Sequence, residues 1–324
     1  IAEAGEELVP PWLRFLRGIV DSADLPLNVS RELLQQSPVL ARLRSAIVRR
    51  VLAELERKAE SAPEDYAVFW GHFGAVLKEG LYEDAEARPR LLKLARFRGT
   101  AGDKLVSLAD YVGRMAAGQS AIYTISGGDA QALAQSPQLE GFRAKGVEVL
   151  LLTDPVDDFW ISAVGEFDGK PFRSATRGGA DLAAVTGAPA APPVEKADGP
   201  ALATLIALLK QALGGQVKDV RESGRLTDSA VCLVAGEGDL DLHLERILRQ
   251  HGKVREASLR ILEINPGHKL IKKLAERATK PGAADALADT AHLLLDQARI
   301  SEGEALPDPP AFARRLAALM ARLA

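Results

Sequence analysis

The chain has 324 residues, with 41 Lys and Arg against 44 Asp and Glu, a net charge of −3 and 47% hydrophobic residues. This length allows two domains, and the composition is typical of a soluble globular protein, which excludes disorder of the whole chain. The near-neutral charge argues against a dedicated nucleic-acid or membrane-surface binder. The longest apolar stretch, ALATLIALL, is about half of the roughly 20 residues that a membrane-spanning helix needs.

The first part of the chain is predicted to be irregular and then helical. Residues 1–29 contain turn-forming Pro, Asp and Asn, and a helical pattern runs from Ser30 to about Phe97. Ser37 followed by Pro38 predicts a helix start, because Ser caps helices and Pro is favoured at their first position. Apolar residues then recur at spacings of three and four up to Leu55. A second helix is expected around 66–77 and a short third one at 91–94.

The next segment is predicted to contain a parallel strand pair. AIYTI and VEVLLL are short apolar runs separated by a helical segment that ends at Gly146. Strand, helix, strand and helix over 120–165 indicate a βαβ unit, and EFDGKPF closes it with a turn. Residues 186–200 are rich in proline and read as an interdomain linker.

The last third alternates helices and strands. Helices are expected at 200–213 and 239–250, strands at 217–223, 230–235 and 258–264, and two final helices at 283–299 and 309–323. The final helices have narrow apolar seams, which include Leu287, Leu294, Phe312, Leu316, Leu319 and Leu323. Such seams could pack on the domain's own sheet or form a symmetric four-helix bundle with a second copy. The single cysteine, Cys232, lies in an apolar strand and is expected to be a buried, reduced thiol.

Motifs for common enzyme chemistry are absent from the sequence. It has no phosphate-binding loop, dinucleotide fingerprint, zinc-protease motif or nucleophile elbow, and its five histidines are scattered, so no metal site is expected. The basic run from Arg88 to Lys104 leaves a nucleic-acid-binding helical scaffold as an alternative, although a solvated helical face is favoured. A hydrolase that acts without upstream sequence is a second alternative.

Three features are candidates for binding. Arg31 occupies a first helical turn, where a cation opposes the helix dipole, and with Asn28 and free backbone amides it could bind a phosphate oxygen; the alternative is a surface arginine offset by Glu32. Phe159 and Trp160 are adjacent aromatics that cannot easily both face one core. The helix at 239–250 has one apolar face, with Leu242 off it. Exposed apolar surface of this kind marks binding sites.

Several segments together resemble the heat shock protein 90 family in its bacterial form. They are DSADLPLNVSRELLQQSPVL, DYVGRM, AIYTISG, EVLLLTDPVDDFW, EFDGKPFRS, GRLTDSAVCLV and LEINPGHKLI, in the family's order over nearly the whole chain. The resemblance implies a mixed α/β, α+β fold with five parts. These are the tail of the large middle subdomain with the catalytic loop (1–36), a helical connector (37–119), a small αβα middle subdomain (120–185), the linker (186–200), and an α+β dimerisation domain that ends in a helix pair (201–324).

The resemblance also implies an ATP-dependent homodimeric molecular chaperone for partly folded client proteins in the cytoplasm. ATP and Mg²⁺ would be bound by an N-terminal domain outside this chain, which begins at Ile1 and is expected to hydrolyse no ATP alone. Carried over by position, Arg31 would contact the ATP γ-phosphate, and Asn28 and Gln35 would position its loop.

Further roles carried over from the family concern partners. Client contacts would come from Asp158, Phe159, Trp160, Leu240, Leu242, Leu244 and Leu248. The seam residues of the last two helices would form the dimer bundle. Tetratricopeptide co-chaperones, nucleic acid and membranes are not expected as partners, since the chain ends at MARLA without an acidic tail.

Overall fold

A computed structural model describes residues 8–21, 38–177, 182, 184–185, 196–254, 256 and 258–321. The chain divides into two compact units. Unit 1 contains the residues up to Arg114 together with Thr153–Pro171, and unit 2 contains Met115–Leu152 together with Phe172 onward. Helices and strands occur in both, so the expected mixed α and β character is confirmed. The bounds of the five predicted parts stay predictions.

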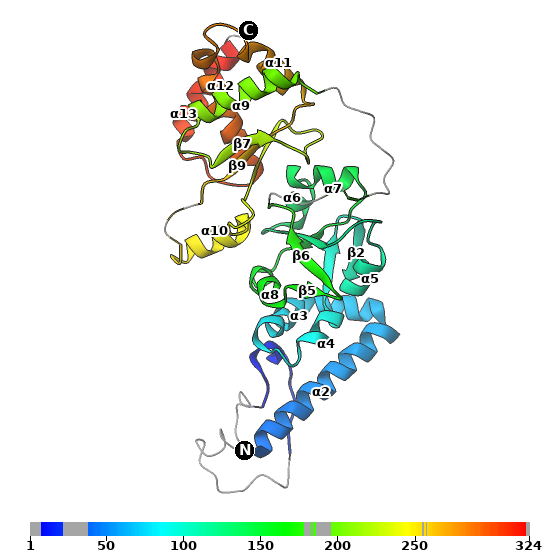
Figure 1. Cartoon of the computed structure of the whole chain (residues 1–324). Helices are drawn as coiled ribbons and strands as arrows, with labels where there is room; N and C mark the ends of the chain where they lie inside the picture. Colours follow the sequence, from blue (N-terminus) through cyan, green and yellow to red (C-terminus); the bar gives the residue numbers. More distant parts are fainter. Residues whose placement is uncertain are drawn as a thin grey trace. The chain divides into compact units, whose positions relative to one another are not determined.

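Unit 1 is built mainly from helices, and Figure 1 shows those of residues 38–94 in blue and cyan. Its elements are η1 (Pro11–Leu13), α2 (Pro38–Ser61), α3 (Pro63–Glu83), α4 (Arg88–Leu94), β1 (Arg96–Gly99), β2 (Gly102–Ser107), α5 (Leu108–Gly113), α8 (Asp157–Val164) and β5 (Glu166–Phe167). Helices α2 and α3 each begin with proline, which suits the first turn. The apolar face of α3 is buried through Tyr66, Trp70 and Leu77, so the three predicted helices are confirmed.

The prediction of a helical pattern up to about Phe97 is wrong at its end. Helix α4 stops at Leu94, and β1 and β2 pair as an antiparallel hairpin in which Phe97 faces Val106. In β1, Phe97 and Gly99 are buried while Arg98 between them is exposed, which is the two-residue alternation of a strand. The run of basic residues around this hairpin had suggested a helical face.

The first part of unit 2 contains the predicted parallel strands. Strand β3 (Ile122–Ser126) pairs in parallel with both β4 (Leu150–Leu152) and the unit-2 residues of β6 (Lys170–Ser174). Between β3 and β4 lie α6 (Ala130–Ala134), η2 (Pro137–Leu139) and α7 (Glu140–Ala144). The expected turn in EFDGKPF is confirmed: Asp168 and Gly169 have φ of 51° and 69° and join β5 to β6 in a hairpin, as a two-residue Asp-Gly turn favours.

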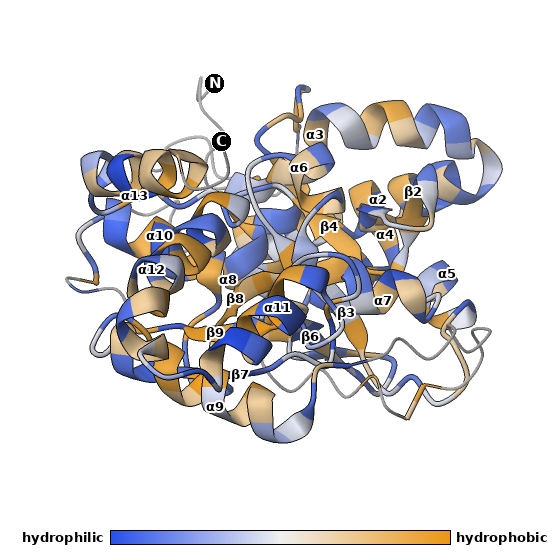
Figure 2. Cartoon of the chain, turned by 90° about the horizontal axis from the view of Figure 1, so that it is seen from above, coloured by the Kyte–Doolittle hydropathy of each residue, from blue (hydrophilic) through white to orange (hydrophobic). Residues whose placement is uncertain are grey.

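The second part of unit 2 is a three-stranded sheet with helices packed on it. Its elements are α9 (Gly199–Ala212), β7 (Asp219–Glu222), β8 (Val231–Val234), α10 (Leu242–Gln250), β9 (Ile261–Ile264), α11 (Lys269–Ala278), α12 (Ala283–Ser301) and α13 (Pro309–Ala321). Strand β9 is central, parallel to β7 and antiparallel to β8. Strands β8 and β9 are wholly buried, and their residues are hydrophobic except for Glu263 in β9; Figure 2 shows this sheet among the helices that cover it. Helices α9, α11 and α12 share one apolar core with this sheet.

Helix α11 was not predicted, although its sequence contains the signal. Ile271, Leu274, Ala275 and Ala278 are buried at helical spacing, while charged residues occupy all of the other positions except Leu270. Cys232 is buried in β8 as expected, and burial raises the pKa of its thiol well above the ordinary value. Among the described residues, no helix has both the length and the apolar character needed to cross a membrane.

Candidate functional site

Helix α8 brings the two adjacent aromatics of unit 1 to different environments. Trp160 is fully buried, its Nε1 donates a hydrogen bond to Asp157 Oδ1 at 2.7 Å, and its ring lies 5.8 Å from that of Phe97. Phe159, about 100° further round the helix, is 37% exposed and meets the exposed ring of Tyr82 edge-on at 6.5 Å. Asp158 is buried. Of the three predicted client contacts on this helix, only Phe159 therefore offers surface in this structure, and Trp160 is a core residue.

A buried lysine fixes α8 to α3, a contact that the sequence pattern did not predict. Lys78 Nζ lies 2.7 Å from Asp157 Oδ1 and 2.6 Å from Asp154 Oδ2. Burial raises the pKa of Asp157, and the Lys78 charge opposes that shift. The signal was a lysine directly after the core residue Leu77. Because a buried charge needs a partner, this pair holds the helix that presents Phe159.

Helix α10 of unit 2 lies with part of its polar face against the protein. Leu242 and Glu245 are buried, whereas Leu240, Leu244 and Leu248 are half-buried. Glu245 forms an ion pair with Arg260 at 3.0 Å and accepts a hydrogen bond from Ser258 N at 2.9 Å. In Figure 1 the helix, in yellow, stands apart from α9, α11, α12 and α13. Leu242 is thus a packing residue in this structure, while the other three leucines keep part of their surface.

The two C-terminal helices differ in how their apolar residues are used. Leu287 and Leu294 on α12 are buried in the core that unit 2 forms with its own sheet. On α13, Phe312 is half-buried, Leu316 and Leu319 are each 38% exposed, and Met320 is 61% exposed. Leu323 lies outside the described residues. Helix α12 therefore packs on the chain's own sheet, which is one of the two arrangements that the apolar spacing allowed. Helix α13 keeps an apolar face at the surface.

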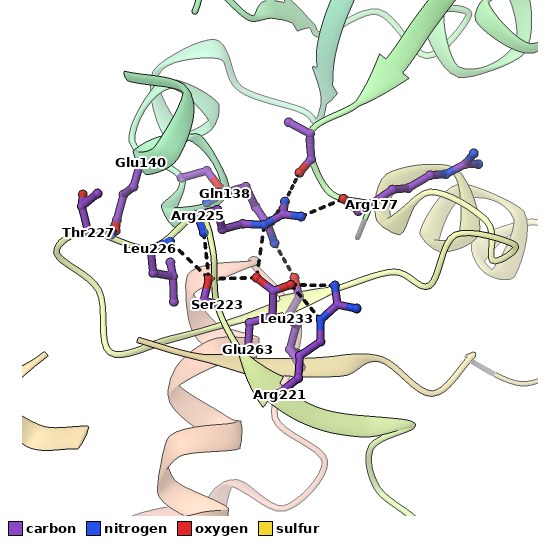
Figure 3. A network of polar contacts seen from close by, with 12 residues as sticks. Gln138, Glu140, Arg177, Arg221, Ser223, Arg225, Leu226, Thr227, Leu233 and Glu263 are labelled. Carbon is purple, nitrogen blue, oxygen red and sulfur yellow. Dashed lines mark hydrogen bonds and ion pairs between the residues drawn. The ribbon is translucent and has the colours of Figure 1, made fainter. Parts of the chain in front are cut away.

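A polar network, which the sequence analysis missed, joins the loop after β7 to η2 and α7 (Figure 3). Glu263 of β9 contacts Arg221 at 2.7 Å, Ser223 Oγ at 2.9 Å and Arg225 Nε at 3.2 Å. Arg225 in turn donates to Gln138 Oε1 at 3.1 Å. Gln138 donates to the carbonyl oxygen of Leu233 and to Glu302 Oε1. Arg225 and Glu263, which are both buried, are therefore paired with each other.

Glu140 binds the same loop from its other side. Its carboxylate accepts hydrogen bonds from the backbone N–H groups of Thr227, Asp228 and Ser229 at 2.7–3.1 Å. Burial alone would raise the pKa of Glu140, but these hydrogen bonds hold it below its ordinary value. Next to it, Gly141 lies so close to Arg225 that an added Cβ would stand 2.8 Å from the Arg225 carbonyl oxygen.

Comparison with known families shows which kind of protein carries these surfaces. A family model described as Hsp90 protein matches residues 1–324. The chain belongs to the Hsp90 family. The bacterial sequence resemblance is confirmed as well, because similar curated proteins are named chaperone protein HtpG. They include those of Paramagnetospirillum magneticum, at 58% identity, and Roseobacter denitrificans, at 55%, each aligned over 99% of this chain and 52% of the relative. The chain spans about half the length of the curated relatives it matches.

The resemblance to the Hsp90 family predicts a contact with ATP for one loop of the chain. Arg31, Asn28 and Gln35 lie outside the described residues, so their roles stay predictions. Within the described part of the chain, no three or more His, Cys, Asp and Glu side chains are grouped so that they could hold a metal ion. The surfaces that can be described are thus Phe159 with Tyr82, the half-buried leucines of α10, and the apolar face of α13.

Proposed function

We propose that this chain is the part of an ATP-dependent Hsp90-type chaperone that forms the homodimer and contributes client-binding surface. Membership of the Hsp90 family and 50–58% identity to HtpG proteins support this proposal. In this proposal the catalytic loop lies in residues 1–36, a helical connector of the middle domain in 37–119, and the small αβα middle subdomain in 120–185. The dimerisation domain, 201–324, follows the linker at 186–200. In this proposal the protein acts in the cytoplasm.

The exposed apolar face of α13 is the observation on which the dimer rests. Leu316, Leu319 and Met320 lie within two turns of one helix and are all exposed. Leaving such a row in water is unfavourable, by about 25 cal/mol for each Å² of apolar surface. A second copy that presents the same face would cover it, and two helices from each protomer, α12 and α13, would then form a four-helix bundle.

The dimer is tested by light scattering behind size-exclusion chromatography. The wild-type chain should have a mass near twice 34.6 kDa, and the double substitution Leu316→Glu with Leu319→Glu should reduce it to the monomer. Leu270→Glu is the matched control, because Leu270 on α11 has the same 38% exposure but lies on another helix. A monomeric wild-type chain at tens of micromolar, or a dimer that survives the α13 substitutions, would exclude this interface.

Client binding is proposed for Phe159 and for the half-buried leucines Leu240, Leu244 and Leu248. Each offers apolar surface beside charged groups, which suits weak binding of partly folded proteins. Substituting Phe159 and Leu248 with serine should lower the capacity of the chain to suppress aggregation of a heat-unfolded test enzyme. Equal suppression by the variant and the wild type would contradict this assignment.

The ATP-related roles are proposed from the family resemblance. Arg31 would stabilise charge on the γ-phosphate, with Asn28 and Gln35 positioning it, while ATP and Mg²⁺ are bound elsewhere in the longer protein. The chain by itself is expected to show no ATPase activity. An ATP turnover by this chain that disappears in Arg31→Ala would show that the nucleotide site is here instead.

A further inference from the structure

A short segment at the end of β6, the strand that pairs with β3, is held by charged groups on two sides. It comprises Ser174, Ala175, Thr176 and Arg177, at the end of β6 and directly after it. Ser174 ends the strand, and Ala175 and Thr176 form a turn in which Arg177 N donates to the carbonyl oxygen of Ser174 at 3.4 Å. Here the side chains of the first and third residues contact one charged group, and the carbonyl oxygens of the second and fourth contact another.

The first charged group is Asp241, which caps the N-terminus of α10. Its Oδ1 accepts a hydrogen bond from His243 N at 2.9 Å, as an N-cap does. Its Oδ2 accepts from Thr176 Oγ1 at 2.7 Å and from Ser174 Oγ at 2.5 Å. Asp241 is 8% exposed, so these hydroxyls replace water around the second carboxylate oxygen. Hydrogen bonds to a charged group in such surroundings are among the stronger ones.

The second charged group is Arg225 from the loop after β7. Its guanidinium donates to the carbonyl oxygens of Ala175 and, at 2.8 Å, Arg177 (Figure 3). The backbone of the segment is also fixed to β8's end, because Ala235 N donates to Thr176 O at 3.0 Å. Arg225 and the end of β8 thus fix the backbone of the segment. The hydroxyl groups of the segment in turn fix Asp241.

We propose that Ser174 and Thr176 are positioning residues for α10: through Asp241 they fix the direction in which this helix presents its half-buried leucines. The helix is also held by the Glu245–Arg260 ion pair one turn along and by two long hydrogen bonds, of 3.5 Å, from Arg246 to the carbonyl oxygens of Glu302 and Gly303. With these contacts in place, the polar side of α10 stays against the protein, and Leu244 and Leu248 stay available. The functional value of this positioning rests on the proposed role of α10 in client binding.

The decisive variant is Ser174→Ala combined with Thr176→Val. It removes both hydroxyls but leaves Asp241 able to cap α10 through His243 N. Hydrogen–deuterium exchange of the wild-type and variant chains should show α10 amides exchanging at least tenfold faster in the variant, while those of α11 and α12 keep their rates. Ser107→Ala is the matched control, because Ser107 Oγ also donates to a carboxylate, that of Asp110 at 2.6 Å, but in unit 1. It should leave α10 exchange unchanged.

Two outcomes would overturn the proposal. Unchanged exchange in α10 would mean that the hydroxyls do not hold the helix, and equally faster exchange in α10, α11 and α12 would mean that they stabilise the whole unit instead. Binding of fluorescently labelled, reduced and carboxymethylated α-lactalbumin, which is permanently unfolded, is measured in parallel. If the wild-type chain does not bind it, the client-binding role of α10 fails, whereas the exchange result still decides the positioning role.

Discussion

Replacing Gly141 by alanine tests the close contact between α7 and the loop after β7. The added Cβ would stand 2.8 Å from the carbonyl oxygen and 2.9 Å from the Cα of Arg225, both backbone atoms that cannot rotate away. Overpacking of this kind costs about 1–3 kcal/mol, and the better helix propensity of alanine offsets at most about 1 kcal/mol of it. We therefore expect a net loss of roughly 1–2 kcal/mol in the free energy of unfolding of unit 2.

Thermal unfolding followed by circular dichroism measures the effect. For a unit of this size each kcal/mol shifts Tm by about 2–4 °C, so Gly141→Ala should lower it by roughly 2–8 °C. Gly199→Ala is the matched control, because Gly199 is also helical and in unit 2 but has no atom within 4 Å of an added Cβ. It should leave Tm unchanged or slightly raised. A Gly141→Ala chain as stable as the control would refute the contact.

Three further predictions concern charged and exposed residues. Lys78→Met should destabilise unit 1 by about 3–5 kcal/mol, because it leaves Asp157 buried without its cation; denaturant unfolding measures this, and a loss under 1 kcal/mol would contradict it. Burial raises the pKa of Glu302 to about 7, so its contribution to stability is fully present below the ordinary value of 4.5 and is lost as pH rises through about 7. Unit 2 should accordingly be more stable at pH 5.5 than at pH 8, and Glu302→Gln should flatten that dependence; a variant with the wild-type pH profile would disprove the assignment. Phe159→Ser should lower the free energy of unfolding by about 1–2 kcal/mol, since Phe159 is 37% exposed and loses only its covered part, whereas a loss of about 3–5 kcal/mol in the same denaturant titration would place Phe159 in the core.

The sequence predicted the regular elements best where one periodic pattern was strong. The apolar spacing of α3, the βα pattern leading to β3 and β4, and the Asp-Gly turn before β6 all appear as expected. Prediction failed where short elements have weak patterns. The hairpin of β1 and β2 contains few apolar residues, and its arginines and lysine resemble a helical face. Helix α11 has a clear apolar face, but the lysines between its apolar residues made this pattern harder to recognise.

The candidate surfaces were harder to predict, because exposure depends on tertiary contacts. Adjacent aromatics in a helix must diverge, so the sequence indicated that Phe159 and Trp160 have different environments, but it could not say which one is buried. In the structure Trp160 faces inward, where its Nε1 donates to Asp157, the partner of Lys78. Likewise, the spacing of apolar residues along the last two helices could not show that Leu287 and Leu294 pack against the chain's own sheet. Networks such as Arg225 with Glu263 join residues far apart in sequence and have no local signal.

The buried ion pair of Lys78 also bears on how the chain folds during its synthesis. Asp157 follows Lys78 by 79 residues, and at roughly 5–20 residues per second a ribosome needs about 4–16 s to make that stretch. Until then α3 carries a lysine that cannot be buried without its partner. Unit 1 therefore cannot complete its packing as a nascent chain before α8 has emerged, after the first segment of unit 2 has already left the ribosome.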